Sequence, residues 1–266
     1  MAGSTFASRS YRDLGVILRT QKLGEADRII TVLTSSHGLV RAVAKGVRRT
    51  QSKFGATLEP FMVADVQFVR GRSLDIITQA VSRSTYGALI AADYEKYTAA
   101  SAMAEAAERV AEHDAETVLG GAAEERQRRR SGAAGRAPQF DLLHGALSAL
   151  ARGVHDTDLV LSSYLLRALG AAGWAITWSV CVACGAPGAH RGFHSGAGGP
   201  VCPDCRPPGT RTLSAGTAEL LHALQHGQWA QASEASTDLR HEATGVATDY
   251  AQHHLERRLT SLRLAQ

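Results

Sequence analysis

The stretch Gly38-Leu-Val-Arg-Ala-Val-Ala-Lys-Gly46 alternates in the character of its side chains and ends at a glycine. A period of two residues is typical of a β-strand with one buried face. One face of this strand would carry Leu39, Arg41, Val43 and Lys45, and the other Val40, Ala42 and Ala44. The preceding segment Ser35-Ser-His-Gly38 has the composition of a hairpin turn and indicates pairing with the apolar run before it.

Four more strand-like runs flank this one within the first 85 residues. We expect β-strands at Leu14–Thr20, Asp27–Thr34, Leu39–Ala44, Met62–Arg70 and Leu74–Ala80, with a second hairpin turn at Gly71-Arg-Ser73. Five short strands in so little chain predict a small barrel of the oligonucleotide-binding (OB) type. The pattern alone is nearly as compatible with an SH3-like barrel.

The composition of the chain changes at about residue 85. The first 85 residues hold 22 Val, Ile or Thr and 8 Ala, whereas the remaining 181 hold 21 and 37. Branched side chains favour a pleated sheet and alanine favours helix interiors. We therefore expect two domains, a β-domain at residues 1–85 and a helical domain at residues 86–266.

Helical periodicity recurs through the second part of the chain. The predicted helices are Tyr94–His113, Phe140–Ala151, Asp158–Ala172, Ala215–Gln225 and roughly Asp238–Leu264. In the second of these, Phe140, Leu143, Leu147 and Leu150 fall on one face. The Arg-rich, Gly- and Ala-rich segment 120–138 has low complexity, and we expect a flexible loop there.

All four cysteines form two matched pairs, Cys181-x-x-Cys184 and Cys202-x-x-Cys205, separated by seventeen residues. Each pair places two thiolates on one side of a tight turn, and two such turns supply a tetrahedral zinc site. Four protein ligands leave no position for water, so we expect one structural zinc ion. The predicted fold class is therefore α+β: an N-terminal five-stranded OB barrel, then an all-helical C-terminal domain with an inserted four-cysteine zinc ribbon at residues 178–208.

Other uses of these cysteines are less favoured. A redox Cys-x-x-Cys site is the alternative, but no βαβ pattern surrounds either pair. His190 and His194 lie between the pairs and could replace a cysteine, although four thiolates already complete the shell. A zinc deaminase would need His-x-Glu before Pro-Cys-x-x-Cys, whereas Val201 precedes Cys202 here. We find no catalytic constellation and expect no enzyme activity.

Charge is distributed unevenly along the chain. Residues 1–85 hold 13 Lys and Arg against 6 Asp and Glu, and the remainder holds 16 against 19. This asymmetry indicates that the first part meets a polyanion. The chain starts without an apolar run, its longest uncharged stretch is broken by glycines, and its cysteines are few. We therefore expect a soluble protein of the cytoplasm.

The basic residues that would meet nucleic acid cluster after the third strand. From Arg28 to Leu58 there are six basic residues and no acid. Cations at the rim of an OB barrel bind the phosphates of single strands, and Phe54 would serve either as a stacking surface or as a core residue. The predicted nucleic-acid-binding residues are Lys45, Arg48, Arg49 and Lys53, with Arg28, Arg41, Arg70 and Arg72 in support.

Residues 12–81 resemble the RecO family of bacterial recombination mediator and DNA repair proteins. The matching pieces are Gly15-Val-Ile-Leu-Arg-Thr20, Gly24-Glu-Ala-Asp-Arg-Ile29, Leu33-Thr34, Gly38–Gly46, Ser52-Lys-Phe-Gly55 and Leu58-Glu-Pro-Phe61. Three later pieces are similar to zinc-bearing members: Leu165–Gly173, Cys181-Val-Ala-Cys-Gly185 and Gly199-Pro-Val-Cys202. Segment 120–138 departs from the family pattern as an insertion.

This resemblance implies an OB fold followed by a helical domain with a zinc ribbon. It implies binding of single- and double-stranded DNA, hence association with the nucleoid, and annealing of complementary single strands. It also implies partners: RecR, the C-terminal tail of single-strand binding protein and, indirectly, RecA.

Two other hypotheses remain from the residues: an RNA-binding or chaperone module with an OB fold and structural zinc, and an enzyme with a divergent zinc site. The three tryptophans Trp174, Trp178 and Trp229 would either pack in the core or receive a partner peptide.

Overall fold

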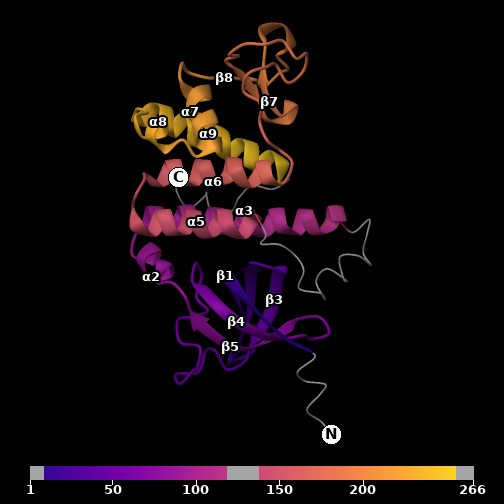
Figure 1. Ribbon diagram of the computed structural model, residues 1–266, viewed down its shortest axis with the longest axis vertical. Coiled ribbons are helices and arrows are strands. Elements are labelled where there is room, and N and C mark those ends of the chain that lie inside the picture. Colours follow the sequence, from indigo (N-terminus) through magenta and orange to yellow (C-terminus); the bar gives the residue numbers. More distant parts are fainter. Residues whose placement is uncertain (1–8, 119–137, 256–266) are drawn as a thin grey trace. The chain divides into compact units, whose positions relative to one another are not determined.

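The computed structural model describes residues 9–118 and 138–255, and the chain divides into two compact units, residues 1–152 and 153–266 (Figure 1). Among the described residues, the first unit holds a β-barrel and three helices, and the second holds four helices and a small sheet. The change from strands to helices near residue 85 lies inside the first unit. A separate domain at residues 1–85 stays a prediction.

The barrel closes from five strands in the order β1-β2-β3-β5-β4. The strands are β1 Ser10–Leu23, β2 Asp27–Thr34, β3 Gly38–Ala44, β4 Val63–Val69 and β5 Asp75–Ser82. Only β3 and β5 run parallel, and every other neighbouring pair of the barrel is antiparallel. The predicted five-stranded OB barrel is confirmed.

Strand β1 is twice as long as predicted because two partners share it. Its first half pairs with β4, from Ser10 to Val16, and its second half pairs with β2, from Gly15 to Leu23. Gly15 belongs to both ladders, and a Cβ there would lie 2.3 Å from Cγ1 of Val32. The glycine thus permits the close crossing that closes the barrel.

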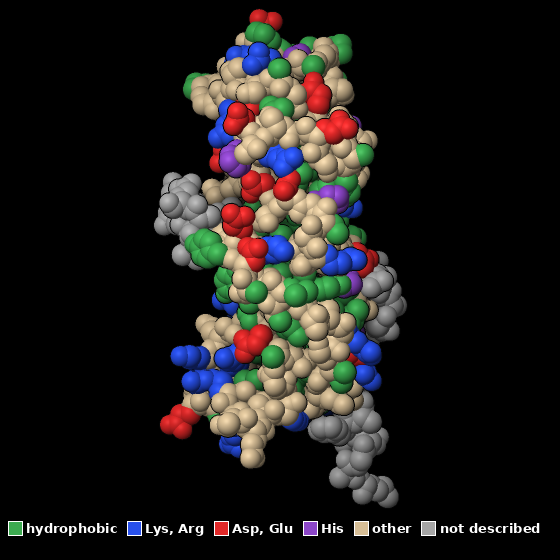
Figure 2. Space-filling view, turned by 90° about the vertical axis from the view of Figure 1, so that its left-hand side faces the viewer, with side chains coloured by type: hydrophobic (Ala, Val, Ile, Leu, Met, Phe, Trp, Pro, Cys, Tyr) green, Lys and Arg blue, Asp and Glu red, His purple; other side chains and the backbone are tan. Residues whose placement is uncertain are grey.

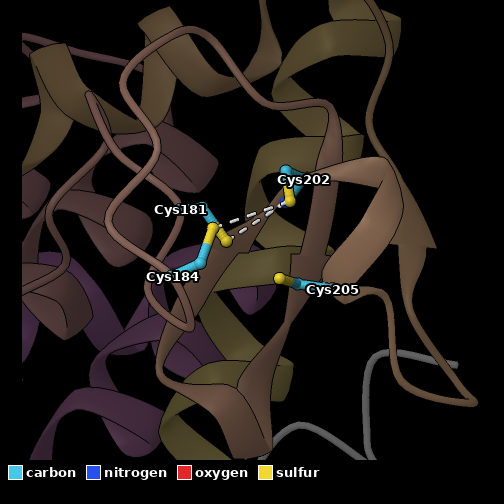
Figure 3. A group of neighbouring side chains, drawn as sticks. All are labelled: Cys181, Cys184, Cys202 and Cys205. Atoms are coloured by element: carbon cyan, nitrogen blue, oxygen red, sulfur yellow. Dashed lines mark hydrogen bonds between the residues drawn. The ribbon is translucent and has the colours of Figure 1, made fainter.

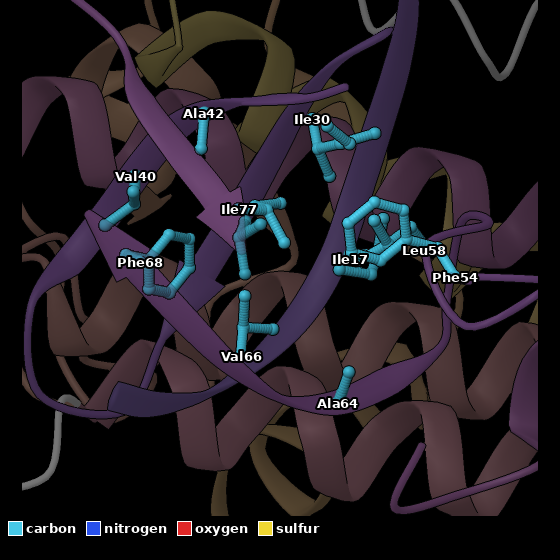
Figure 4. Packing of buried hydrophobic residues seen from close by; sticks show 12 residues of the cluster. Ile17, Ile30, Val40, Ala42, Phe54, Leu58, Ala64, Val66, Phe68 and Ile77 are labelled. Carbon is cyan, nitrogen blue, oxygen red and sulfur yellow. The ribbon is translucent and has the colours of Figure 1, made fainter. Parts of the chain in front are cut away.

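The barrel interior is a continuous apolar core (Figure 4). Its buried members are Ile17, Ile30, Val32, Val40, Ala42, Ala44, Phe54, Leu58, Ala64, Val66, Phe68 and Ile77. Phe54 and Leu58 come from the segment between β3 and β4. Because Phe54 is only 2% exposed, it is a core residue and offers no face to a base. Burying a side chain of this size stabilises the fold by about 1.5–3 kcal/mol.

The described part of the first unit also contains the helices α2 Tyr86–Ala91, α3 Tyr94–Val118 and α5 Pro138–Arg152. The predicted apolar face of α5 is buried. Helix α3 contacts the barrel through an ion pair between Arg19 and Glu108 (2.7 Å) and an edge-to-face contact between Phe61 and Tyr97. Segment 120–138, predicted as a loop, lies outside the described residues except for Pro138, which begins α5.

The second unit contains helices α6 Thr157–Ala171, α7 Thr217–His226, α8 Trp229–Ser233 and α9 Thr237–His254. Between α6 and α7 lies a sheet of β6 Gly192–His194, β7 Gly199–Val201 and β8 Arg211–Thr212 in the order β7-β6-β8, with the 3-10 turns η2 Ser195–Ala197 and η3 Pro203–Cys205. The expected extension of the last helix to Leu264 falls outside the described residues. Among the helices described, none has the length and apolar character to cross a membrane.

Candidate metal centre and nucleic-acid surface

The two cysteine pairs lie on two tight turns, the first between α6 and β6 and the second between β7 and β8. The backbone N–H of Gly185 donates to the carbonyl of Cys181 (2.8 Å), and that of Cys205 donates to the carbonyl of Cys202 (3.1 Å). Gly185 adopts a φ of 75°, a left-handed conformation that glycine reaches without strain. These turns are the two predicted knuckles.

The four sulfur atoms face a common centre (Figure 3). All four lie within 4.8 Å of one another, and Sγ of Cys184 is 3.9 Å from Sγ of Cys202. Zinc–sulfur bonds of about 2.3 Å in a tetrahedron would separate the sulfurs by about 3.8 Å. The spacing therefore fits a tetrahedral ion. Over residues 9–118 and 138–255, no other group of three or more His, Cys, Asp or Glu brings its ligand atoms this close.

Local hydrogen bonds shift the pKa values of two of the cysteines in opposite directions. The backbone N–H of Cys202 donates to Sγ of Cys181 (3.3 Å), and this bond, with those from the backbone of Cys184 and Ala183, lowers the pKa of Cys181 to about 6. In contrast, the Cys205 thiol hydrogen-bonds to the sulfurs of Cys202 and Cys184, which raises its pKa. Four thiolates this close repel one another unless a cation offsets their charge. The donor set thus suits a divalent cation.

The two histidines of the ribbon have other contacts. Nδ1 of His194 accepts the backbone N–H of Ala197 (3.0 Å), which caps η2. Nε2 of His190 lies 2.9 Å from the carbonyl oxygen of Ala186. Neither residue belongs to the cysteine cluster.

Basic side chains project from the outer face of β3 and from the loop after it. Arg41, Lys45 and Arg49 are exposed, as is Arg72 in the hairpin between β4 and β5. In the described part of the chain, none of these four forms an ion pair. Figure 2 shows Lys and Arg side chains gathered over the barrel, in the lower part of that view. The barrel therefore presents cations that no described carboxylate offsets.

Two further cations of this loop are held by backbone carbonyls. The Arg48 guanidinium donates to the carbonyls of Gly24 (3.3 Å) and Glu25 (2.8 Å), in the turn between β1 and β2. Nζ of Lys53 donates to the carbonyl of Thr78 (2.7 Å) on β5. These hydrogen bonds to neutral carbonyls fix the loop against the barrel.

The other two predicted cations, Arg28 and Arg70, contact side chains of the protein. Arg28 forms an ion pair with Glu59 (2.7 Å), which offsets its charge. The guanidinium of Arg70 lies over the ring of Tyr11, 5.0 Å from its centroid. The eight predicted nucleic-acid-binding residues thus lie on one barrel but are not equivalent, and their contact with nucleic acid stays a prediction.

A polar cluster around Tyr11 carries no signal in the sequence. The ring of Tyr11 lies 4.5 Å from that of His37, and its hydroxyl donates to Asp75. His37 in turn contacts Asp13, and Oδ2 of Asp13 is 2.6 Å from Nδ1 of the imidazole. These residues are far apart in sequence, so only the closing of the barrel brings them together.

The tryptophans pack within the second unit. Trp178 is buried and donates to Oε1 of Gln225 (3.2 Å), while Trp229 stacks on His155 at 4.0 Å. Trp174 stacks on His254 at 5.2 Å. Intramolecular packing therefore accounts for all three rings.

Family models match both parts of the chain. Residues 9–86 match the model described as recombination protein O, N terminal, and residues 134–263 match the model described as recombination protein O, C terminal. The first match contains the barrel with its exposed cations, and the second contains the four cysteines. The two matches together cover more than half of the 266 residues and occur in the order of the family.

Proposed function

Because the chain belongs to the RecO family of recombination proteins, we propose that it acts in DNA repair as a recombination mediator. In this role it binds single- and double-stranded DNA and anneals complementary single strands. The observation that carries the proposal is the set of exposed cations on β3 and the following loop, which no described carboxylate pairs with.

Annealing requires no bond chemistry. Two single strands repel through their phosphates, and a surface that neutralises phosphates lowers this repulsion while it leaves the base edges free to pair. Arg41, Lys45 and Arg49 are suited to contact phosphates because their side chains are exposed. Arg48 and Lys53 add charge and hold the loop in place.

The cysteine cluster is proposed to hold one structural zinc ion. Bound zinc would join the turn of Cys181 and Cys184 to that of Cys202 and Cys205 and would leave no position for water. The chain's own contribution is the pair of knuckles, whose backbone hydrogen bonds orient the sulfurs toward one another. Zinc thus stabilises the second unit and takes no part in a reaction.

The proposed partners follow from membership of the family. We propose that the protein works with RecR and with the C-terminal tail of single-strand binding protein, and that it thereby assists the loading of RecA. Its place of action is DNA in the cytoplasm. No described side chain is assigned to these protein partners.

An annealing assay tests this function. Complementary DNA strands, bare or coated with single-strand binding protein, are mixed with the full chain, and duplex formation is followed by fluorescence. We expect faster annealing of both kinds of strand, because a mediator acts on coated DNA and a simple cation acts only on bare DNA. A lack of acceleration on coated strands would contradict the mediator role, and a preference for structured RNA in direct competition would favour an RNA chaperone.

A further inference from the structure

A pocket of about 330 Å³ opens in the barrel beside the N-terminal half of β3. Its walls come from β1, the turn before β3, β3 itself and the hairpin between β4 and β5. The basic loop that begins at Lys45 follows the other end of the same strand. Arg41, an exposed residue of β3, belongs to the lining of the pocket.

One wall of the pocket is an open strand edge. Strand β3 pairs with β2 along its whole length but with β5 only from Ala42 to Ala44. Within the described residues, Gly38–Arg41 has no strand partner on the side of β5. Backbone N–H and C=O groups on such an edge are available to hydrogen-bond a ligand.

The charges around the pocket favour an anion at its mouth. Arg41 is exposed and forms no ion pair with a described residue, and Arg70 is held in place over the ring of Tyr11. The acid in the lining is Asp75, whose carboxylate accepts the Tyr11 hydroxyl and the backbone N–H of Gly71 (3.0 Å). The lining thus sets two arginines against one carboxylate, and this balance of charge favours an anion.

The remaining walls suit a sugar and a base. Tyr11 stacks on the buried ring of Phe68 at 5.0 Å with an interplanar angle of 19°, so the wall is fixed before a ligand arrives. Leu39 and Leu74 add apolar surface to the lining. The volume far exceeds that of an inorganic phosphate and is of the size that ligand pockets for small molecules occupy.

We propose that this pocket receives one unpaired nucleotide of a single DNA strand, with its phosphate at Arg41 and Arg70 and its base beside the open edge of β3. A base within a duplex is stacked and paired, and extracting it costs free energy that a single strand does not expend. The pocket would therefore make the barrel prefer single strands over double strands. This inference rests on the proposed function, because it names the form of DNA that the same barrel selects.

Filling the pocket tests the inference. Ser73 is an exposed residue of its lining, and a Ser73→Trp variant places an indole where the nucleotide would lie. Gln79→Trp, at an exposed position on β5 outside the lining, is the matched control. The probes are a fluorescent oligothymidylate and a blunt duplex of the same length. We expect Ser73→Trp to weaken binding of the single strand by roughly tenfold, the size of one base contact, and to leave duplex binding and the Gln79→Trp control unchanged.

A second variant distinguishes a loss of DNA contact from a folding defect. Arg41→Gln keeps an exposed polar side chain on β3, and we expect it to weaken single-strand binding more than duplex binding. Equal losses of affinity for both probes, or no loss of single-strand affinity with Ser73→Trp, would overturn the inference. The open edge of β3 would then be a site at which a peptide strand could pair. If the wild-type protein bound neither probe, the proposed function itself would fail.

Discussion

The arginines of the barrel differ in what their side chains touch. Four of them pair with carboxylates: Arg12 and Arg83 with Asp65, Arg19 with Glu108 and Arg28 with Glu59. Arg41, Arg49 and Arg72 form no such pair with described residues. A phosphate would therefore meet the second group at full charge, whereas the first group stabilises the protein.

Reversing one exposed cation tests this division. We expect Arg49→Glu to weaken single-strand binding several-fold and to flatten the slope of log affinity against log salt by about 1, because one phosphate contact is replaced by a repulsion. Lys96→Glu on α3 makes the same change of charge outside the predicted surface and is the control. Fluorescence anisotropy over a salt series measures both variants, and equal effects of the two would argue against a localised site.

Adding Arg48→Glu to this variant should weaken binding further. The measured loss then has two causes, because Arg48 also holds the turn at Gly24 and Glu25. Arg49 is therefore the cleaner probe of phosphate contact.

Asp13 provides a test of stability against pH. Burial alone would raise its pKa, but hydrogen bonds from His37, Ser35 and the Ser36 backbone N–H lower the pKa below the ordinary value of 3.8. Because the folded-state pKa lies below that of the unfolded chain, this stabilisation is complete above the unfolded value and is lost as pH falls through the folded one.

We expect Asp13→Asn to lower the free energy of unfolding by about 1–3 kcal/mol at neutral pH, with the difference from wild type closing in acid. Urea denaturation at several pH values measures it. Glu25→Gln, at an exposed position, should change stability by less than about 0.5 kcal/mol. A deficit that stayed constant into acid would show that the carboxylate's charge is not what stabilises this turn.

At the scale of elements, the cluster of four cysteines was predicted from the spacing of its two pairs. Two Cys-x-x-Cys pairs suffice to predict two knuckles, because the turn itself sets the geometry of each pair. The contacts of His190 and His194 were beyond sequence reasoning, since each depends on a partner fixed by the fold. Short helices α2 and α8 were also missed, because six and five residues are too few to show a helical period.

Removal of the metal should unfold the ribbon and spare the barrel. Zinc contributes about 10–16 kcal/mol of apparent binding free energy to small Cys-rich sites, so its loss decides whether these turns form. We expect about one zinc per chain by atomic absorption, and Cys202→Ser should lose the metal and raise amide exchange across the ribbon. His194→Ala is the control and should keep its zinc. Metal-free protein with four free thiols, purified without chelator, would contradict the assignment.

A comparison of the stability of two fragments tests where the barrel domain ends. Composition places the boundary at residue 85, whereas Glu108 and Tyr97 of α3 contact the barrel at Arg19 and Phe61. We expect a fragment of residues 1–152 to be more stable than one of residues 1–85 by at least about 2 kcal/mol, because the shorter one exposes Phe61. Urea denaturation compares them, and equal stability would support an independent domain at 1–85.

At the scale of the whole molecule, the charge asymmetry seen in the sequence has a structural counterpart. The barrel strands lie between Ser10 and Ser82, and the cations of this region divide into paired and exposed groups that no sequence pattern distinguishes. Alternation predicted β3, in which buried and less buried residues alternate, whereas β1 and β2 contain runs of consecutive buried residues. The pocket beside β3 was not predictable, because it depends on β5 pairing with only part of β3.

The salt dependence of single-strand binding by the full chain tests the central claim most directly. Six predicted cations keep a charge that no described carboxylate offsets: Arg41, Lys45, Arg48, Arg49, Lys53 and Arg72. If these six displace counterions from phosphates, log affinity falls against log salt with a slope of roughly −4. Tight binding with a slope near zero would contradict the claim that this protein acts on DNA by neutralising phosphates.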